Sequence, residues 1–111
     1  MSVNNFNLSI NKSSTKGSYI VNLTGNLSVD NSVAIHKFLH YEALTQDVIT
    51  VLVNDSDDID LSTIQIIIGY LKARNKSKKE TYIKLDLDKN LIELLNKSGS
   101  LALISSLQNK N

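Results

Sequence analysis

The chain has 111 residues, 41% of them hydrophobic, and a formal net charge of +1 from 12 basic and 11 acidic residues. This length predicts a single domain over residues 1–111, and a charge so close to zero gives no overall field to gather nucleic acid or an anionic membrane. Cysteine is absent, which excludes disulfides, thiolate metal sites and a cysteine nucleophile.

The amino-terminal stretch has neither the basic start nor the apolar run of a signal peptide. No apolar run reaches the about 20 residues that a membrane-spanning helix needs. We therefore expect a cytoplasmic protein that does not insert into the membrane.

The first half of the chain predicts a hairpin, a helix and a buried strand. Apolar and polar residues alternate over residues 6–10, and a loop closed by Gly17 leads to a second strand over residues 19–23. A turn is expected at residues 24–26. Apolar residues at helical spacing predict a helix over residues 31–44, capped by Asp30 or Ser28. The β-branched run at residues 48–53 is typical of a strand buried on both faces in a parallel sheet.

The second half predicts two more helices and a strand. A helix is expected from residue 62 to residue 74 and a strand over residues 81–85. Asp88 should cap the next helix, and Gly99 should follow its end. Residues 100–104 predict a short strand or a turn. This order predicts an α/β fold with a mixed sheet of four to five strands and helices packed mainly on one face.

Three stretches resemble the STAS domain, named for sulfate transporters and anti-sigma-factor antagonists, over about residues 6–104. YIVNLTGNL resembles the second strand and Gly-x-Leu of that family, with Gly25 and Leu27 in place. VITVLVN resembles the central strand, with Asn54 where the family usually has Asp. IDLSTIQ resembles the loop Ile-Asp-Ser-Ser-Gly-Leu-Gly, which aligns Asp60 with its Asp and Ser62 with the phosphoacceptor serine.

The resemblance implies a STAS-type fold and a regulatory binding function rather than an enzyme. A protein of this kind resembles an anti-sigma-factor antagonist, which binds a serine-kinase anti-sigma factor and is switched off when the loop serine, here Ser62, is phosphorylated. Leu61 replaces the first serine of the loop, and Thr63 and Gln65 replace its two glycines. These departures favour an alternative, a STAS scaffold subunit of a membrane lipid transporter that is not phosphorylated, whereas Asp60 and Ser62 favour the antagonist.

The residues alone allow two roles for Ser62. Ser62 and Gln65 fit a capping box, in which each side chain binds the backbone N–H of the other residue. A phosphate on Ser62 would also meet the free N–H groups and the positive dipole end at the start of the helix. The two roles are compatible.

One face of the helix over residues 62–74 has the pattern of a protein-binding surface. Ile64, Ile67, Ile68 and Leu71 form the predicted core stripe. The opposite face carries small and apolar residues where charges are usual, which indicates an interface. With the residues that the resemblance adds, the predicted partner-binding set is Asp60, Ser62, Thr63, Ile66, Gly69, Tyr70 and Asn26, with residues 55–58 at its rim. A monomer or a weak dimer is expected.

Other clusters predict neither a metal site, a cofactor nor catalysis. The acidic residues 55–60 lack the Gly and Glu positions of a calcium loop. His36 and His40 have a spacing that can bind zinc, but no third ligand is evident, so a surface pair is expected. The basic stretch at residues 72–79 has no aromatic residues for base stacking, and no nucleophile or phosphate-binding motif occurs.

Overall fold

The computed structural model describes residues 6–108, without the side chains of residues 55–58. Its elements in chain order are β1 (Phe6–Lys12), β2 (Ser18–Leu27), the 3-10 helix η1 (Val29–Asn31), α1 (Ser32–Tyr41), β3 (Val48–Ile59), α2 (Leu61–Lys76), β4 (Glu80–Leu85), α3 (Lys89–Lys97) and α4 (Ser100–Leu107).

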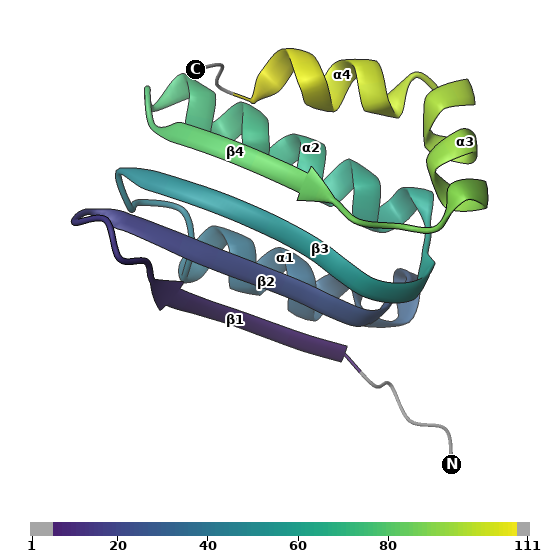
Figure 1. Cartoon of the computed structure of the whole chain (residues 1–111), viewed down its shortest axis with the longest axis horizontal. Coiled ribbons are helices and arrows are strands. Elements are labelled where there is room, and N and C mark those ends of the chain that lie inside the picture. Colours follow the sequence, from purple (N-terminus) through teal and green to yellow (C-terminus); the bar gives the residue numbers. More distant parts are fainter. Residues whose placement is uncertain (1–5, 109–111) are drawn as a thin grey trace.

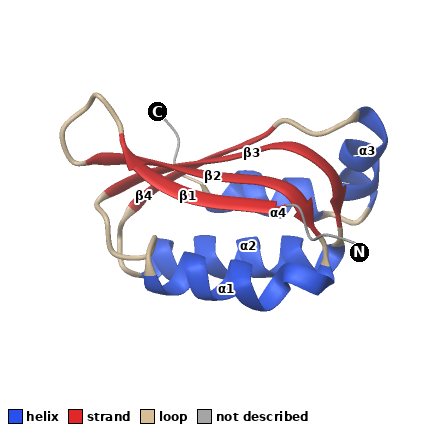
Figure 2. Cartoon of the chain, turned by 90° about the horizontal axis from the view of Figure 1, so that it is seen from below, coloured by secondary structure: helices blue, strands red, loops and turns tan. Residues whose placement is uncertain are grey.

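The four strands form one mixed sheet in the order β1-β2-β3-β4 (Figure 1). β1 pairs antiparallel with β2, whereas β2, β3 and β4 run parallel. Figure 2 shows α1 and α2 side by side beneath one face of the sheet, and α4 packs beside α2. The predicted fold class is therefore confirmed, with four strands and helices on one face.

The core lies between that face and the helices. The predicted stripe of α2 is buried, and so are the β3 residues Ile49, Val51 and Val53. The alternate β3 residues Val48, Thr50 and Leu52 are only half-buried. The prediction that β3 is buried on both faces is wrong because no helix within residues 6–108 covers the second face of the sheet (Figure 2).

The predicted turn at residues 24–26 is instead part of β2. Gly25 has a φ of +86°, and the pairing of β2 with β3 shifts register between Thr24 and Asn26. A glycine in this left-handed region lets a strand carry a bulge and continue. β2 and β3 therefore both extend beyond their predicted ends, to Leu27 and Ile59.

The carboxyl-terminal segment is the helix α4, not a strand or a turn. Gly99 follows the end of α3 with a φ of +81°, as predicted, and α4 starts at the next residue. Leu101 and Ile104, three residues apart, pack against the core, which is helical rather than strand periodicity. The segment is short enough for the two periods to be confused.

Of the N-caps predicted for α1 and α3, only the cap of α3 is confirmed. Asp88 caps α3, and its Oδ1 accepts a 2.9 Å hydrogen bond from the Leu91 N–H. Neither Ser28 nor Asp30 caps α1, because η1 precedes it and Asn31 occupies the cap position. The Asn31 amide instead donates to the Asn26 carbonyl at 2.8 Å.

Arg74, a fully buried arginine, joins the carboxyl-terminal half of α2 to the loop before β3 and to the start of β4. The Arg74 Nε donates to Thr81 Oγ1 at 2.7 Å, and the other guanidinium nitrogens donate to the carbonyls of Leu44, Gln46 and Glu80. Burial lowers the pKa of Arg74, but an arginine remains charged in proteins. The hydrogen bonds therefore compensate a buried charge and fix the loop before β3 and the first residues of β4.

Candidate functional site

The start of α2 is organised by Asp60 rather than by Ser62. Asp60 is the N-cap residue, and its Oδ1 accepts from the Thr63 N–H at 3.3 Å. Its Oδ2 accepts from the Val29 N–H at 2.8 Å. One carboxylate thus caps α2 and also holds the start of η1 against it.

The predicted capping box of Ser62 and Gln65 is therefore wrong. The backbone of Asp60 is extended, with a φ of −121° and a ψ of 178°, and the helix begins at Leu61. Ser62 lies inside the first turn, and its exposed hydroxyl has no hydrogen-bond partner among the described residues. The first-turn N–H groups of a helix lack carbonyl partners within it, so Ser62 combines an accessible hydroxyl with a favourable setting for an anion.

Two residues of the predicted partner-binding set are not on the surface. Thr63 and Tyr70 are both fully buried. The Tyr70 hydroxyl donates to the Ala43 carbonyl at 2.6 Å, and burial raises the pKa of Tyr70 to about 12. Because α1 and α4 flank α2 on opposite sides, the buried arc of α2 is wider than a single stripe, which removes both residues from a contact surface.

The other predicted residues occupy positions that a partner could reach. Ser62 and Gly69 are exposed, whereas Asn26, Asp60 and Ile66 are half-buried. Ile66 also packs against the core. Residues 55–58, predicted at the rim, lie in β3, but their side chains are outside the described part of the structure.

Exposed apolar residues around the start of α2 were not identified from the sequence. Val29 is 56% exposed, Val33 69% and Leu61 45%. A groove of about 310 Å³ runs between α1 and α2 and is lined by Ser32, Val33, His36, Lys37, Tyr41 and Ile66. The sequence could have indicated part of this exposed apolar surface, because Val33 and Tyr41 are apolar or aromatic residues outside the core stripe of α1. We call Val29, Val33, Leu61, Ser62 and Ile66 the α1–α2 surface.

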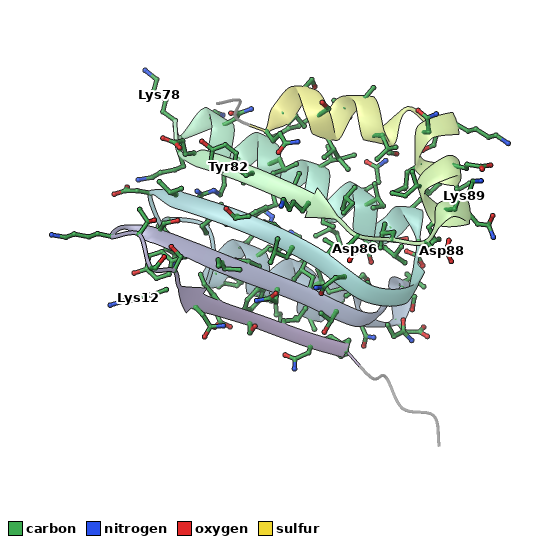
Figure 3. All side chains as sticks on the ribbon, viewed as in Figure 1. Lys12, Lys78, Tyr82, Asp86, Asp88 and Lys89 are labelled. Carbon is green, nitrogen blue, oxygen red and sulfur yellow. The ribbon has the colours of Figure 1, made fainter. Side chains whose placement is uncertain are left out.

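Several carboxylates lie at the same end of the sheet as Ser62. Asp86 and Asp88 follow β4 at this end, together with Lys89, whereas Lys12 and Lys78 lie at the opposite end (Figure 3). Asp30 follows β2 and is exposed. A phosphate on Ser62 would therefore add negative charge to an end that carries charges of both signs.

The described residues contain no group of three or more His, Cys, Asp or Glu side chains that could hold a metal ion. Within that same part of the chain, no helix is long and apolar enough to cross a membrane. The arrangement around Ser62 is an exposed hydroxyl beside apolar side chains and carboxylates, which suits binding and modification by another protein.

Comparison with solved structures identifies the fold. No protein-family model matches the sequence, and no curated protein sequence matches it either. A solved structure described as a proposed anti-sigma factor antagonist (tm1081) from Thermotoga maritima has a TM-score of 0.69 and 18% identity, covering 89% of this chain and 82% of that one. The chain therefore has the STAS-type fold of the anti-sigma factor antagonists, as the resemblance implied.

Two further matches are structures of one protein in two states. The anti-sigma factor antagonist SpoIIAA in its unphosphorylated form has a TM-score of 0.53 and 16% identity, covering 82% of this chain and 81% of that one. The Bacillus cell fate determinant SpoIIAA in its phosphorylated form has a TM-score of 0.51 and 16% identity, covering 96% of this chain and 90% of that one.

Proposed function

We propose that this chain is a regulatory binding protein of the anti-sigma factor antagonist class. Its partner would be a serine-kinase anti-sigma factor, which binds the α1–α2 surface and phosphorylates Ser62. The observation that carries the proposal is the exposed, unbonded hydroxyl of Ser62 in the first turn of α2, beside the exposed side chains of Val29 and Leu61.

The proposed switch acts on the interface rather than on the fold. Phosphate at the start of α2 meets first-turn N–H groups and the positive end of the helix dipole, so it does not unfold the domain. It adds about −1.5 to −2 charges beside apolar residues that the partner must cover. Desolvating that charge opposes binding, and the partner is released.

The test begins with an affinity pull-down of the tagged full-length chain from its own host, with mass spectrometry of bait and partner. We expect a kinase of the anti-sigma class and phosphate on Ser62. Ser62→Asp should weaken binding of the recovered kinase at least about tenfold. The matched control is Ser105→Asp, because Ser105 is an exposed serine of α4. Equal binding by the two variants would reject the switch.

A second function is a scaffold subunit of a membrane lipid transporter. It is favoured by the replacement of both loop glycines, since Thr63 is buried and Gln65 is helical, so this loop cannot flex as a glycine loop does. Recovery of transporter subunits with unmodified Ser62 in the same pull-down would establish this function in place of the first.

A further inference from the structure

The only two histidines of the chain stand together on α1. His36 and His40 are four residues apart, which puts them on one face of the helix. Their ring centroids are 4.3 Å apart, with an angle of 23° between the planes. His36 also lines the groove between α1 and α2.

The ring nitrogens of His36 and His40 are available to bind a ligand. No hydrogen bond or ion pair joins either imidazole to another described residue. The neutral imidazole is the form that binds metals. The groups facing the pair are Lys37 and Tyr41 in the groove lining and Tyr70, whose ring is 6.2 Å from that of His40.

We propose that His36 and His40 form a two-imidazole site for a divalent transition metal ion of the Zn²⁺, Ni²⁺ and Cu²⁺ group. Histidines at this helical spacing can bind one ion. Because the two rings are stacked in this structure, their side chains must rotate to bring one nitrogen of each to about 2 Å from the ion. Imidazole selects these metals, whereas Ca²⁺ and Mg²⁺ prefer oxygen ligands.

The site supplies two protein ligands and leaves the remaining coordination positions to water. No carboxylate is among the groove-lining residues, and the described part of the chain offers no group of three ligands. Binding therefore depends on both rings acting together, and losing either ring should remove the chelate.

The experiment is a calorimetric titration of the full-length chain with Ni²⁺ at pH 7.5. We expect one ion per chain and an affinity at least about tenfold weaker for His36→Ala or His40→Ala, because the second ligand no longer acts intramolecularly. Cu²⁺ should bind more tightly than Ni²⁺. Binding should weaken as the pH is lowered, because protons compete with the metal ion for histidine ligands. No saturable binding by the unmodified chain would overturn the proposal.

A control variant separates chelation from histidine content. His40→Asn combined with Glu42→His keeps two histidines but puts them six residues apart, on different faces of the helix. Glu42 is exposed, and circular dichroism checks that the fold is retained. We expect this double variant to bind Ni²⁺ as weakly as His40→Asn alone. Binding equal to that of the unmodified chain would mean that the pairing of His36 with His40 is irrelevant.

Discussion

At the residue scale, the hydroxyl of Tyr70 allows a direct test of how much one buried hydrogen bond contributes to stability. It is fully buried and donates to the Ala43 carbonyl. Tyr70→Phe leaves that carbonyl without its partner and should lower the free energy of unfolding by about 1–3 kcal/mol at neutral pH. Urea unfolding measures the difference. Tyr41→Phe is the control and should have no effect, because the Tyr41 side chain is 81% exposed.

The same tyrosine predicts a dependence on alkaline pH. Its pKa is raised to about 12 in the folded chain, against about 10 in an unfolded one. The neutral form is thus favoured by folding, and its contribution is complete below about pH 10 and lost as the pH rises towards 12. The stability difference between the unmodified chain and Tyr70→Phe should therefore shrink across this range. A constant difference from pH 9 to pH 12 would contradict the assignment.

Asp60 should matter more than the other capping aspartate. Asp88→Ala removes one cap bond and should cost about 1 kcal/mol. Asp60→Ala removes a cap bond and also the bond to the Val29 N–H, so we expect about 2 kcal/mol. Thermal unfolding of the two variants compares them directly, and equal losses would mean that the bond to Val29 contributes nothing.

Arg74 cannot be replaced by lysine, although both are cations. A lysine ammonium cannot reproduce the planar fork that binds Thr81 Oγ1 and three carbonyls. Arg74→Lys should therefore destabilise the fold by at least about 2 kcal/mol. Lys72→Arg, at an exposed position of the same helix, is the matched control and should change denaturant unfolding very little.

At the scale of elements, α2 contributes residues both to the core and to the candidate site. Gly69 lies on its exposed side, and a Cβ there would meet no atom within 4 Å. Gly69→Ala should therefore stabilise the fold by about 0.5–1 kcal/mol. If the partner backbone approaches α2 closely at this position, the same variant weakens partner binding, which a binding titration measures separately from thermal unfolding.

Apolar periodicity predicted the order of the elements because the strands and helices each bury one regular set of side chains. It predicted the ends of β2 and the cap of α2 poorly, since these depend on distant contacts. The bulge at Gly25 needs the β3 partner, and the cap of α2 is fixed together with Val29, 31 residues away in sequence. Such bonds leave no local pattern.

Only those residues of the candidate site whose position follows from local periodicity were predicted correctly. Ser62 and Ile66 could be placed near the surface from the period of α2 alone. Thr63 and Tyr70 could not, because their burial depends on the helices that flank α2, and one of these, α4, was not predicted as a helix. Val29 lies near the start of α2 because its N–H donates to the Asp60 carboxylate, and both Val29 and Leu61 are exposed.

At the scale of the whole molecule, the net charge is +1 and both ends of the sheet carry charges of both signs. Asp86 and Asp88 lie with Lys89 at the end of the sheet where β4 finishes, and Lys12 and Lys78 lie at the other (Figure 3). Asp86→Lys should slow association of a partner that presents basic residues to the Ser62 end, and added salt should reduce the effect. Glu42→Lys changes the charge equally at an exposed position of the opposite end. Similar association rates for the two variants would exclude electrostatic steering.

The arginine of α2 has a consequence for the motions of the native state. Arg74 binds two carbonyls of the loop that enters β3 and one at the first residue of β4. These segments can separate from α2 only by exposing an unpaired guanidinium and several unpaired carbonyls to a dry interior, which is costly. Amide protons at this end of the sheet should thus exchange with deuterium only through openings close to global unfolding. We expect faster exchange at the α1–α2 surface at the other end, where exposed residues surround Ser62.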